Sequence, residues 1–151
     1  MRIEPYCLGE KLPEALPIKK VSWLDRLLGE RPTVPGETLF RAQEPVDFLG
    51  FKWSVLLGVV QDRIFRISLR CSPKNETLMT ATMVTCVDHC LQTYGPLTPA
   101  TKTQPEFWKT DFGTVSVHGQ AAAGPGTSVR LVKFEFIARL EFGSAFRPSK
   151  N

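Results

Sequence analysis

Hydrophobic and polar residues alternate along two stretches in the first half of the chain. Odd-numbered positions are apolar in residues 51–59, and the same parity is apolar in residues 65–71. Strict alternation sends successive side chains to opposite faces of a strand, so the two stretches predict an antiparallel hairpin. A two-residue turn at Gln61 and Asp62 would put the two apolar sets on opposite faces. We therefore expect either a three-residue loop that includes Arg63 or a β-bulge that restores a common apolar face.

The longest periodic segment is helical and covers residues 72–94. Ser72 is expected to cap it, with Pro73 at the first helical position, and Gly95 is expected to end it. Apolar residues at spacings of three and four form one stripe along it: Met79, Met83, Val84, Cys86, Val87, Cys90, Leu91 and Tyr94. The pattern predicts an amphipathic helix that packs on a sheet through this stripe, with Thr82 and His89 on the opposite side.

Alternation returns after the helix. Residues 107–120 predict a strand, and because the apolar residues on the two sides of Gly113 differ in parity, a bulge is expected there. Residues 132–142 alternate most regularly, with apolar side chains at the even positions. The small residues of segment 119–127 predict a mobile hairpin loop, and residues 39–43 predict a short edge strand.

The order hairpin, helix, hairpin predicts an α+β fold. We expect a two-layer sandwich in which an antiparallel sheet of about four to five strands carries one long helix on one face. The length of 151 residues suits a single domain, placed at residues 39–142. Residues 1–38 are rich in proline and predict an irregular leader with one short helix at residues 22–29, and residues 143–151 predict a frayed tail. The short helix is interpreted as a cover for one end of the core, with a detachable partner-binding helix as the alternative.

Composition places the chain among soluble globular proteins. Hydrophobic residues make up 42% and charged residues 23%, which is ordinary for such proteins and argues against global disorder and against a fibrous chain. The longest apolar run, residues 55–60, is far shorter than the roughly 18 to 20 residues that a membrane span needs. The amino terminus has no apolar secretory segment. We therefore expect a cytoplasmic protein that does not enter a membrane.

Four cysteines are the first candidates for chemistry. Cys7, Cys71, Cys86 and Cys90 have no CxxC spacing. Cys86 and Cys90 lie one helical turn apart on the apolar stripe, where a free thiol packs as a small hydrophobe. They are predicted to be reduced core residues, and no metal or cofactor is expected. The alternatives are a metal site formed with Cys71 and a redox-sensing pair.

The inventory for catalysis is small. His89 and His118 are the two side chains with a near-neutral acid–base function. Asp88 is adjacent to His89, but both are expected to project away from the core, and no serine, cysteine or carboxylate is tied to His118 by the sequence. The tripeptide at residues 111–113 matches a kinase metal-binding motif, but the other kinase motifs are missing from the chain. The residues favour a non-catalytic protein, with a small enzyme that uses one of the two histidines as an alternative.

The outward sheet face offers the best candidate surface, because alternation sends both basic and aliphatic residues to it. These residues are Ile64, Arg66, Arg70, Leu131, Lys133, Ile137 and Arg139. A net charge of +4 favours an acidic partner, yet no basic run points to nucleic acid, and the aromatic residues are assigned to the core. We expect an adaptor, inhibitor or immunity-type module that binds a protein partner or a second copy, and weak nucleic-acid binding is the alternative. Coverage of this face by the leader is the structural alternative.

Overall fold

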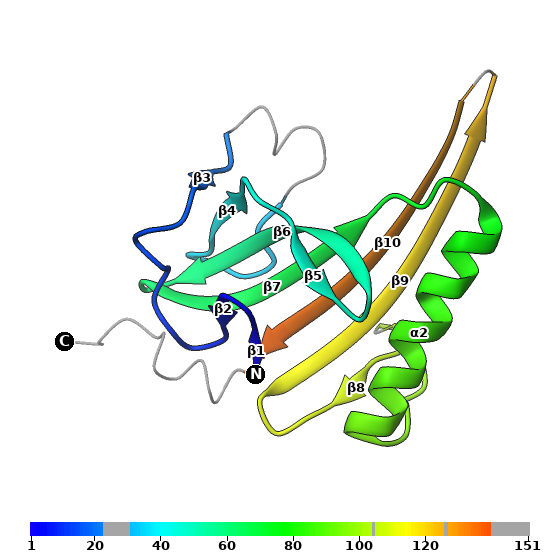
Figure 1. Cartoon of the computed structure of the whole chain (residues 1–151). Helices are drawn as coiled ribbons and strands as arrows, with labels where there is room; N and C mark the ends of the chain where they lie inside the picture. Colours follow the sequence, from blue (N-terminus) through cyan, green and yellow to red (C-terminus); the bar gives the residue numbers. More distant parts are fainter. Residues whose placement is uncertain (23–30, 104, 126, 140–151) are drawn as a thin grey trace.

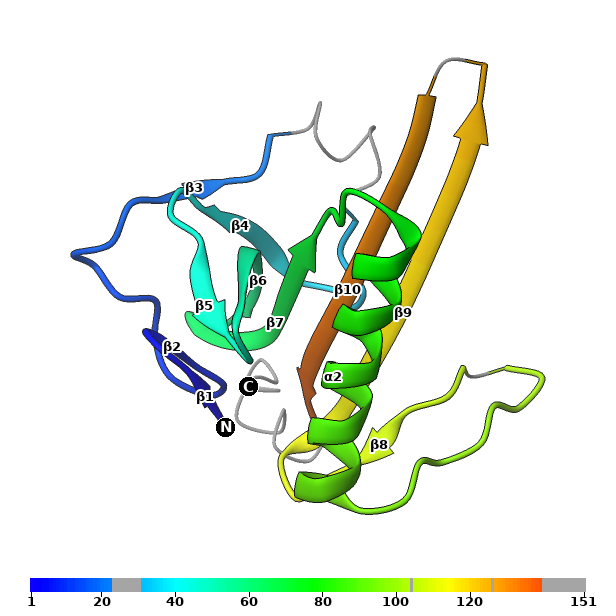
Figure 2. The ribbon, with the colours of Figure 1, turned by 45° about the vertical axis from the view of Figure 1, so that its right-hand side comes forward.

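The computed structural model of the chain describes residues 1–22, 31–103, 105–125 and 127–139. In this part of the chain an eight-stranded antiparallel sheet carries helix α2 (Glu76–Tyr94) on one face (Figures 1 and 2). Seven strands follow one path across the sheet: β3 (Ile18–Lys20), β4 (Thr38–Ala42), β6 (Phe51–Val60), β7 (Arg63–Cys71), β10 (Thr127–Ala138), β9 (Gly113–Gly124) and β8 (Trp108–Lys109). The eighth, β5 (Val46–Phe48), pairs with β6. The predicted α+β class is confirmed.

The prediction of four to five strands was too low. Strands β3, β5 and β8 have only two or three residues each, too few for an alternating pattern to stand out. The leader is also less irregular than expected, since β3 pairs with β4, and β1 (Arg2–Ile3) pairs with β2 (Tyr6–Cys7). The predicted short helix, apart from residue 22, and the predicted tail lie outside the described residues. No helix in the described part of the chain is long and apolar enough to cross a membrane.

A tight turn joins β6 to β7. Gln61 and Asp62 both have left-handed backbone angles, with φ of 49° and 65°, which matches the twist of the two strands. The loop therefore has two residues, and the three-residue alternative is wrong. The register shifts by one residue between Gly58 and Val59, so the hairpin contains the bulge that the apolar pattern required.

The bulge decides which residues at this end of β7 face the core. Phe65 is the extra residue, because Gly58 pairs with Arg66 whereas Val59 pairs with Ile64. Ile64 therefore points into the main core and is fully buried, while Phe65 packs in a separate cluster. The prediction that Ile64 lies on the outward face was wrong, because the position of the bulge could not be read from alternation.

Helix α2 begins later than predicted. Asn75, not Ser72, is the N-cap, and its side chain accepts a hydrogen bond of 2.9 Å from the backbone N–H of Leu78. The predicted end is confirmed, because Gly95 has a φ of 86° and its N–H donates to the carbonyl of Leu91.

The buried side of α2 is rotated relative to the predicted stripe. Cys86 and Cys90 are fully buried as predicted, but Val84 and Leu91 are 52% and 45% exposed. Thr82, which was assigned to the solvent side, is buried, and its hydroxyl donates to the carbonyl of Leu78. A threonine can face a core in this way because the helix backbone satisfies its hydroxyl.

A turn, not a bulge, separates β8 from β9. The backbone N–H of Thr110 donates to the carbonyl of Gly113, and Gly113 has a φ of 152°, which favours glycine. The hairpin places Trp108 opposite Val115, and both are buried. The apolar residues on the two sides of Gly113 do differ in parity, as the sequence showed. The reason is that the turn separates two strands, β8 and β9, so the predicted bulge was wrong.

Strands β9 and β10 form a hairpin much longer than predicted. Their pairing is continuous from Gly113 with Ala138 to Gly124 with Thr127, so most of the small-residue segment is strand. Pairing of β10 with β7 stops at Val132. Residues 120–124 and 127–131 therefore extend past β7 as a two-stranded ribbon, called the arm below (Figure 1).

The main core lies between the sheet and α2. Its largest fully buried side chains include Trp53, Leu57, Ile67, Leu69, Phe134 and Phe136. These are odd positions of β6 and β7 and even positions of β10, so the predicted register is confirmed for them. It is wrong at Phe65, an odd position that was also predicted to face the core, because the bulge turns it to the other face. The leader adds Ile3, Tyr6 and Leu8 to the same core.

Candidate functional site

The outward face of the sheet is partly covered by the leader. Val21 is buried and packs with Leu39 and Leu56, which close the outward side of β4 and β6. Farther along the chain, Thr33 and Val34 approach Phe65 on β7. Coverage by the leader, the structural alternative stated above, therefore holds for this part of the face.

Arg66, one of the predicted surface cations, is buried in an ion-pair cluster. Its Nε donates to Glu37 Oε1 at 2.9 Å and its Nη1 to Glu135 Oε2 at 3.1 Å. Its Nη2 donates to the carbonyl of Arg31 at 3.4 Å. Lys133 Nζ lies 3.2 Å from the second carboxylate oxygen of Glu135. Arg66 is only 2% exposed, so the prediction that it belongs to an accessible outward surface was wrong.

Gly58, which has no side chain, leaves room for this cluster. A Cβ at Gly58 would overlap the carboxylate of Glu37, so glycine lets the carboxylate lie directly above the sheet. The second oxygen of Glu37 accepts hydrogen bonds of 2.7 Å and 2.9 Å from the backbone N–H and hydroxyl of Thr33. A buried carboxylate needs such partners, since an unpaired charge in this position would be costly.

Electrostatics within the cluster favour the charged form of Glu135. Burial alone would raise the pKa of its carboxyl, but the charges of Lys133 and Arg66, with their hydrogen bonds, hold the pKa below its usual value. Glu135 therefore stays ionised and keeps Lys133 at the edge of the cluster, where the lysine side chain is 30% exposed.

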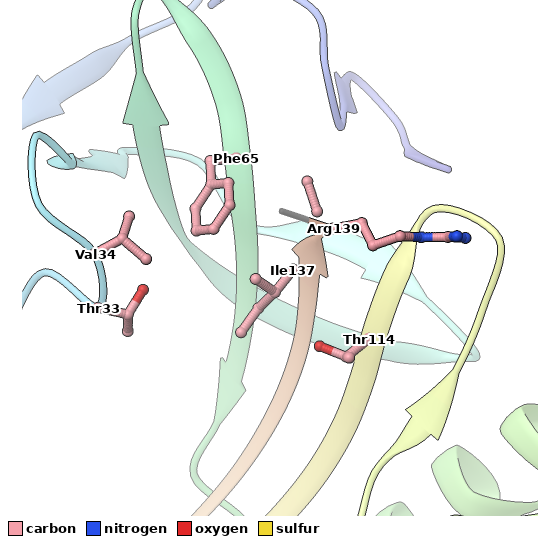
Figure 3. Close-up of a pocket in the computed structure, with 7 residues that line it drawn as sticks. Thr33, Val34, Phe65, Thr114, Ile137 and Arg139 are labelled. Atoms are coloured by element: carbon pink, nitrogen blue, oxygen red, sulfur yellow. The ribbon is translucent and has the colours of Figure 1, made fainter. Parts of the chain in front are cut away.

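A pocket of about 490 Å³ lies beside the ion-pair cluster. Figure 3 shows Phe65 and Ile137 side by side in it, facing Val34 from the leader. Its lining is completed by Thr33, Thr114, Ala138 and Arg139. The pocket exists because the bulge turns Phe65 outward, next to an outward position of β10.

Arg139 borders the pocket without pointing into it. Its Nη2 donates to the carbonyl of Thr110 at 2.7 Å, and its backbone N–H donates to the carbonyl of Phe112. In Figure 3 the guanidinium extends away from Phe65, toward the turn between β8 and β9. The surface left inside the pocket is mainly apolar.

The structure brings together only part of the predicted surface. Ile137 and Arg139 line the pocket, and Lys133 lies at the adjoining cluster. Arg70 pairs with Lys133 across the two strands, and Leu131 begins the arm; both are partly buried.

Phe65, Thr33, Val34 and Thr114 were missed as pocket residues. The only sequence signal for Phe65 was the expected bulge, which had no assigned position. The leader residues carried no signal, because alternation says nothing about which segment crosses a sheet face.

The two histidines do not combine into a catalytic site. The His89 ring packs edge-on against Phe48 with centroids 5.6 Å apart, and burial lowers its pKa. His118 lies on β9 opposite Lys133, on the sheet face away from α2. Within residues 1–22, 31–103, 105–125 and 127–139, no group of three or more His, Cys, Asp or Glu side chains is arranged to hold a metal ion.

The core cysteines are poor nucleophiles. Burial, which is the largest effect, raises the pKa of Cys86 and of Cys90 to about 12. A thiol with such a pKa stays protonated near neutral pH, and the thiolate is the reactive form. Their position therefore fits packing better than redox chemistry.

Comparisons of the chain with protein-family models, with curated proteins and with solved structures found no match. The candidate site therefore rests on its own geometry.

Proposed function

We propose that the protein is a protein-binding module, not an enzyme, and that the outward-face pocket takes up an apolar side chain of its partner. The observation that carries the proposal is the mainly apolar pocket of about 490 Å³ formed by Val34, Phe65 and Ile137. An apolar hollow with a polar border is typical of the centre of a protein interface, where one buried anchor supplies much of the binding energy.

The charges around the pocket favour an acidic partner. Lys133 is paired with Glu135, but Arg139 borders the pocket, Arg70 lies on the neighbouring strand, and the whole chain carries a net charge of +4. Such charges raise the association rate and set the orientation of a partner more than they raise its affinity. We therefore expect a segment in which one large apolar residue is flanked by Asp or Glu.

Binding of single-stranded nucleic acid receives less support. Sheets that bind single strands stack bases on exposed aromatic rings, whereas Trp53, Phe134 and Phe136 are fully buried here. Phosphate contacts alone would give weak, salt-sensitive binding without sequence preference.

A displayed peptide library tests the proposal. Peptides selected on the wild-type chain should carry one large apolar residue with acidic neighbours, and Ile137→Asp should weaken their binding at least tenfold. Val129→Asp is the matched control, because Val129 lies on the same strand and is 61% exposed, outside the pocket. Urea unfolding of both variants shows whether they remain folded.

Two outcomes would refute the pocket as a binding site. One is selection of peptides that bind wild type and Ile137→Asp equally well. The other is a large loss of stability in Ile137→Ala, about 2 to 5 kcal/mol as for a fully buried isoleucine, with unchanged peptide binding.

A further inference from the structure

Strand β9 has an open edge along residues 116–124. Strand β8 pairs only with Thr114 and Val115, and in the described part of the chain no other strand pairs with the outer side of β9. Alternate residues of an edge strand point their N–H and C=O groups away from the sheet. Such a row of unpaired groups is a template for another strand.

This edge lacks the sequence features that usually protect an edge. Natural edge strands carry charged residues, proline or a bulge, are very short, or are covered by a helix or loop. Residues 116–124 contain no Lys, Arg, Asp, Glu or Pro, and their pairing with β10 shows no register shift. With nine residues, the edge is long enough for a stable added strand.

Helix α2 presents an apolar flank on the side of this edge. One flank faces β5, because His89 packs against Phe48. At about 100° per residue, Val84 and Leu91 lie close together on the roughly opposite flank, beyond the buried stripe. Both are about half exposed, and α2 lies beside β9 on the side away from β7 (Figure 1). Val84 follows Met83, which lies over Gly119 of the open edge. Leu91, by contrast, belongs to the last turn of α2, which packs at the β8 end through Tyr94 and Phe112.

We propose that two copies of the chain pair through β9, antiparallel and around a twofold axis at Gln120, to form one continuous sheet. The ends of the open stretch select this register, because β8 blocks it before Ser116 and the hairpin turn at Pro125 closes it after Gly124. In this register, Gly124 at the end of β9 in each copy lies next to the start of β8 in the other copy.

The open stretch is complementary to itself, as a twofold interface requires. Paired around Gln120, it brings no two like charges together. Gly119 of one copy lies opposite Ala121 of the other, and Gly119 already packs directly under Met79 and Met83 of α2. Two small residues at this point leave room for the helix to overhang the joined strands. This surface is separate from the outward-face pocket.

A charge exchange at the axis tests the pairing. Sedimentation equilibrium should give wild type twice the mass of one chain at micromolar concentration. Gln120→Lys and Gln120→Glu should each raise the dimer dissociation constant severalfold, because like charges directly opposite in a sheet repel. An equimolar mixture of the two variants should dimerise more tightly than either variant alone, since opposite charges then meet. Gln92→Lys, an exposed position on α2, is the control and should stay dimeric.

Three results would overturn the proposal: a monomeric wild type at 100 µM, a dimer dissociation constant that is unchanged in Gln120→Lys, or a mixture of the two charged variants that dimerises no more tightly than either alone. The mixture guards against misfolding, because only folded chains can regain the tighter dimer. None of these results bears on the outward-face pocket, so the two proposals can fail separately.

Discussion

At the scale of single residues, one glycine permits a buried charge cluster. Gly58 leaves the space that Glu37 occupies, and the charges of Glu37 and Glu135 balance those of Arg66 and Lys133. Removing one partner from such a cluster typically costs about 3 to 5 kcal/mol, because a buried charge is left without compensation. The cluster therefore attaches the leader firmly to β7 and β10.

The stability of the protein should depend on pH through Glu135. Its carboxyl has a lowered pKa in the folded state, so the unfolded chain binds a proton more readily. The stabilisation is present above the ordinary carboxyl pKa, near about 4.3, and is lost as the pH falls through the lower folded value. Urea unfolding between pH 7 and pH 3 should show a shallower decline for Glu135→Gln than for wild type.

Glu106→Gln removes an exposed carboxyl and is the control; it should keep the wild-type profile. Identical pH profiles for Glu135→Gln and wild type would show that the cluster contributes nothing to acid sensitivity.

Sequence reasoning placed Arg66 and Lys133 on the correct face but predicted the wrong environment for Arg66. The carboxylates that bury its guanidinium come from positions 29 and 69 residues away. Alternation reports which side of a strand a residue occupies, and it does not report what covers that side.

At the scale of elements, local signals gave the right types and less accurate boundaries. Helix α2 and both long hairpins were predicted, but Ser72 was assigned as the cap because Pro73 suits a first helical position, and Asn75 was not considered. The buried side of α2 was misplaced for a related reason. A stripe drawn from apolar residues alone omits Thr82, whose hydroxyl is satisfied within the helix.

Two alanine substitutions separate the candidate caps. Asn75→Ala should lower the free energy of unfolding by about 1 kcal/mol, because the N–H of Leu78 loses its acceptor. Ser72→Ala removes a similar polar group three residues earlier and should change stability by less than about 0.5 kcal/mol. Thermal or urea unfolding measures both, and equal losses would contradict the assignment of the cap.

At the scale of the whole molecule, two hairpins that are each local in sequence are joined by one distant pairing. Residues 66–71 of β7 pair with residues 132–137 of β10, across the whole of α2 and β9. The order hairpin, helix, hairpin was readable from periodicity, so the α+β class followed. The pairing order and the short strands were not readable, because they depend on contacts between distant segments.

The distant pairing should limit the folding rate. Each hairpin closes a short loop, whereas joining β7 to β10 closes a loop of about 60 residues, which is entropically more costly. The pairing of β7 with β10 is called the seam below. Ile67 lies in it opposite Phe136, so Ile67→Val should lower the free energy of unfolding by about 0.5 to 1.5 kcal/mol and slow folding. Val129→Ala in the exposed arm should leave the folding rate unchanged. Stopped-flow refolding distinguishes them, and a folding rate unaffected by Ile67→Val would place the slow step elsewhere.

The seam between β7 and β10 also determines what a newly made chain exposes. Until it closes, each hairpin presents an inner edge that the native sheet later covers, in addition to the outer edge of β9. Apolar strands with open edges associate readily between chains. Refolding yield should therefore fall as protein concentration rises, and the chain should be most prone to aggregate during the interval before its two halves meet.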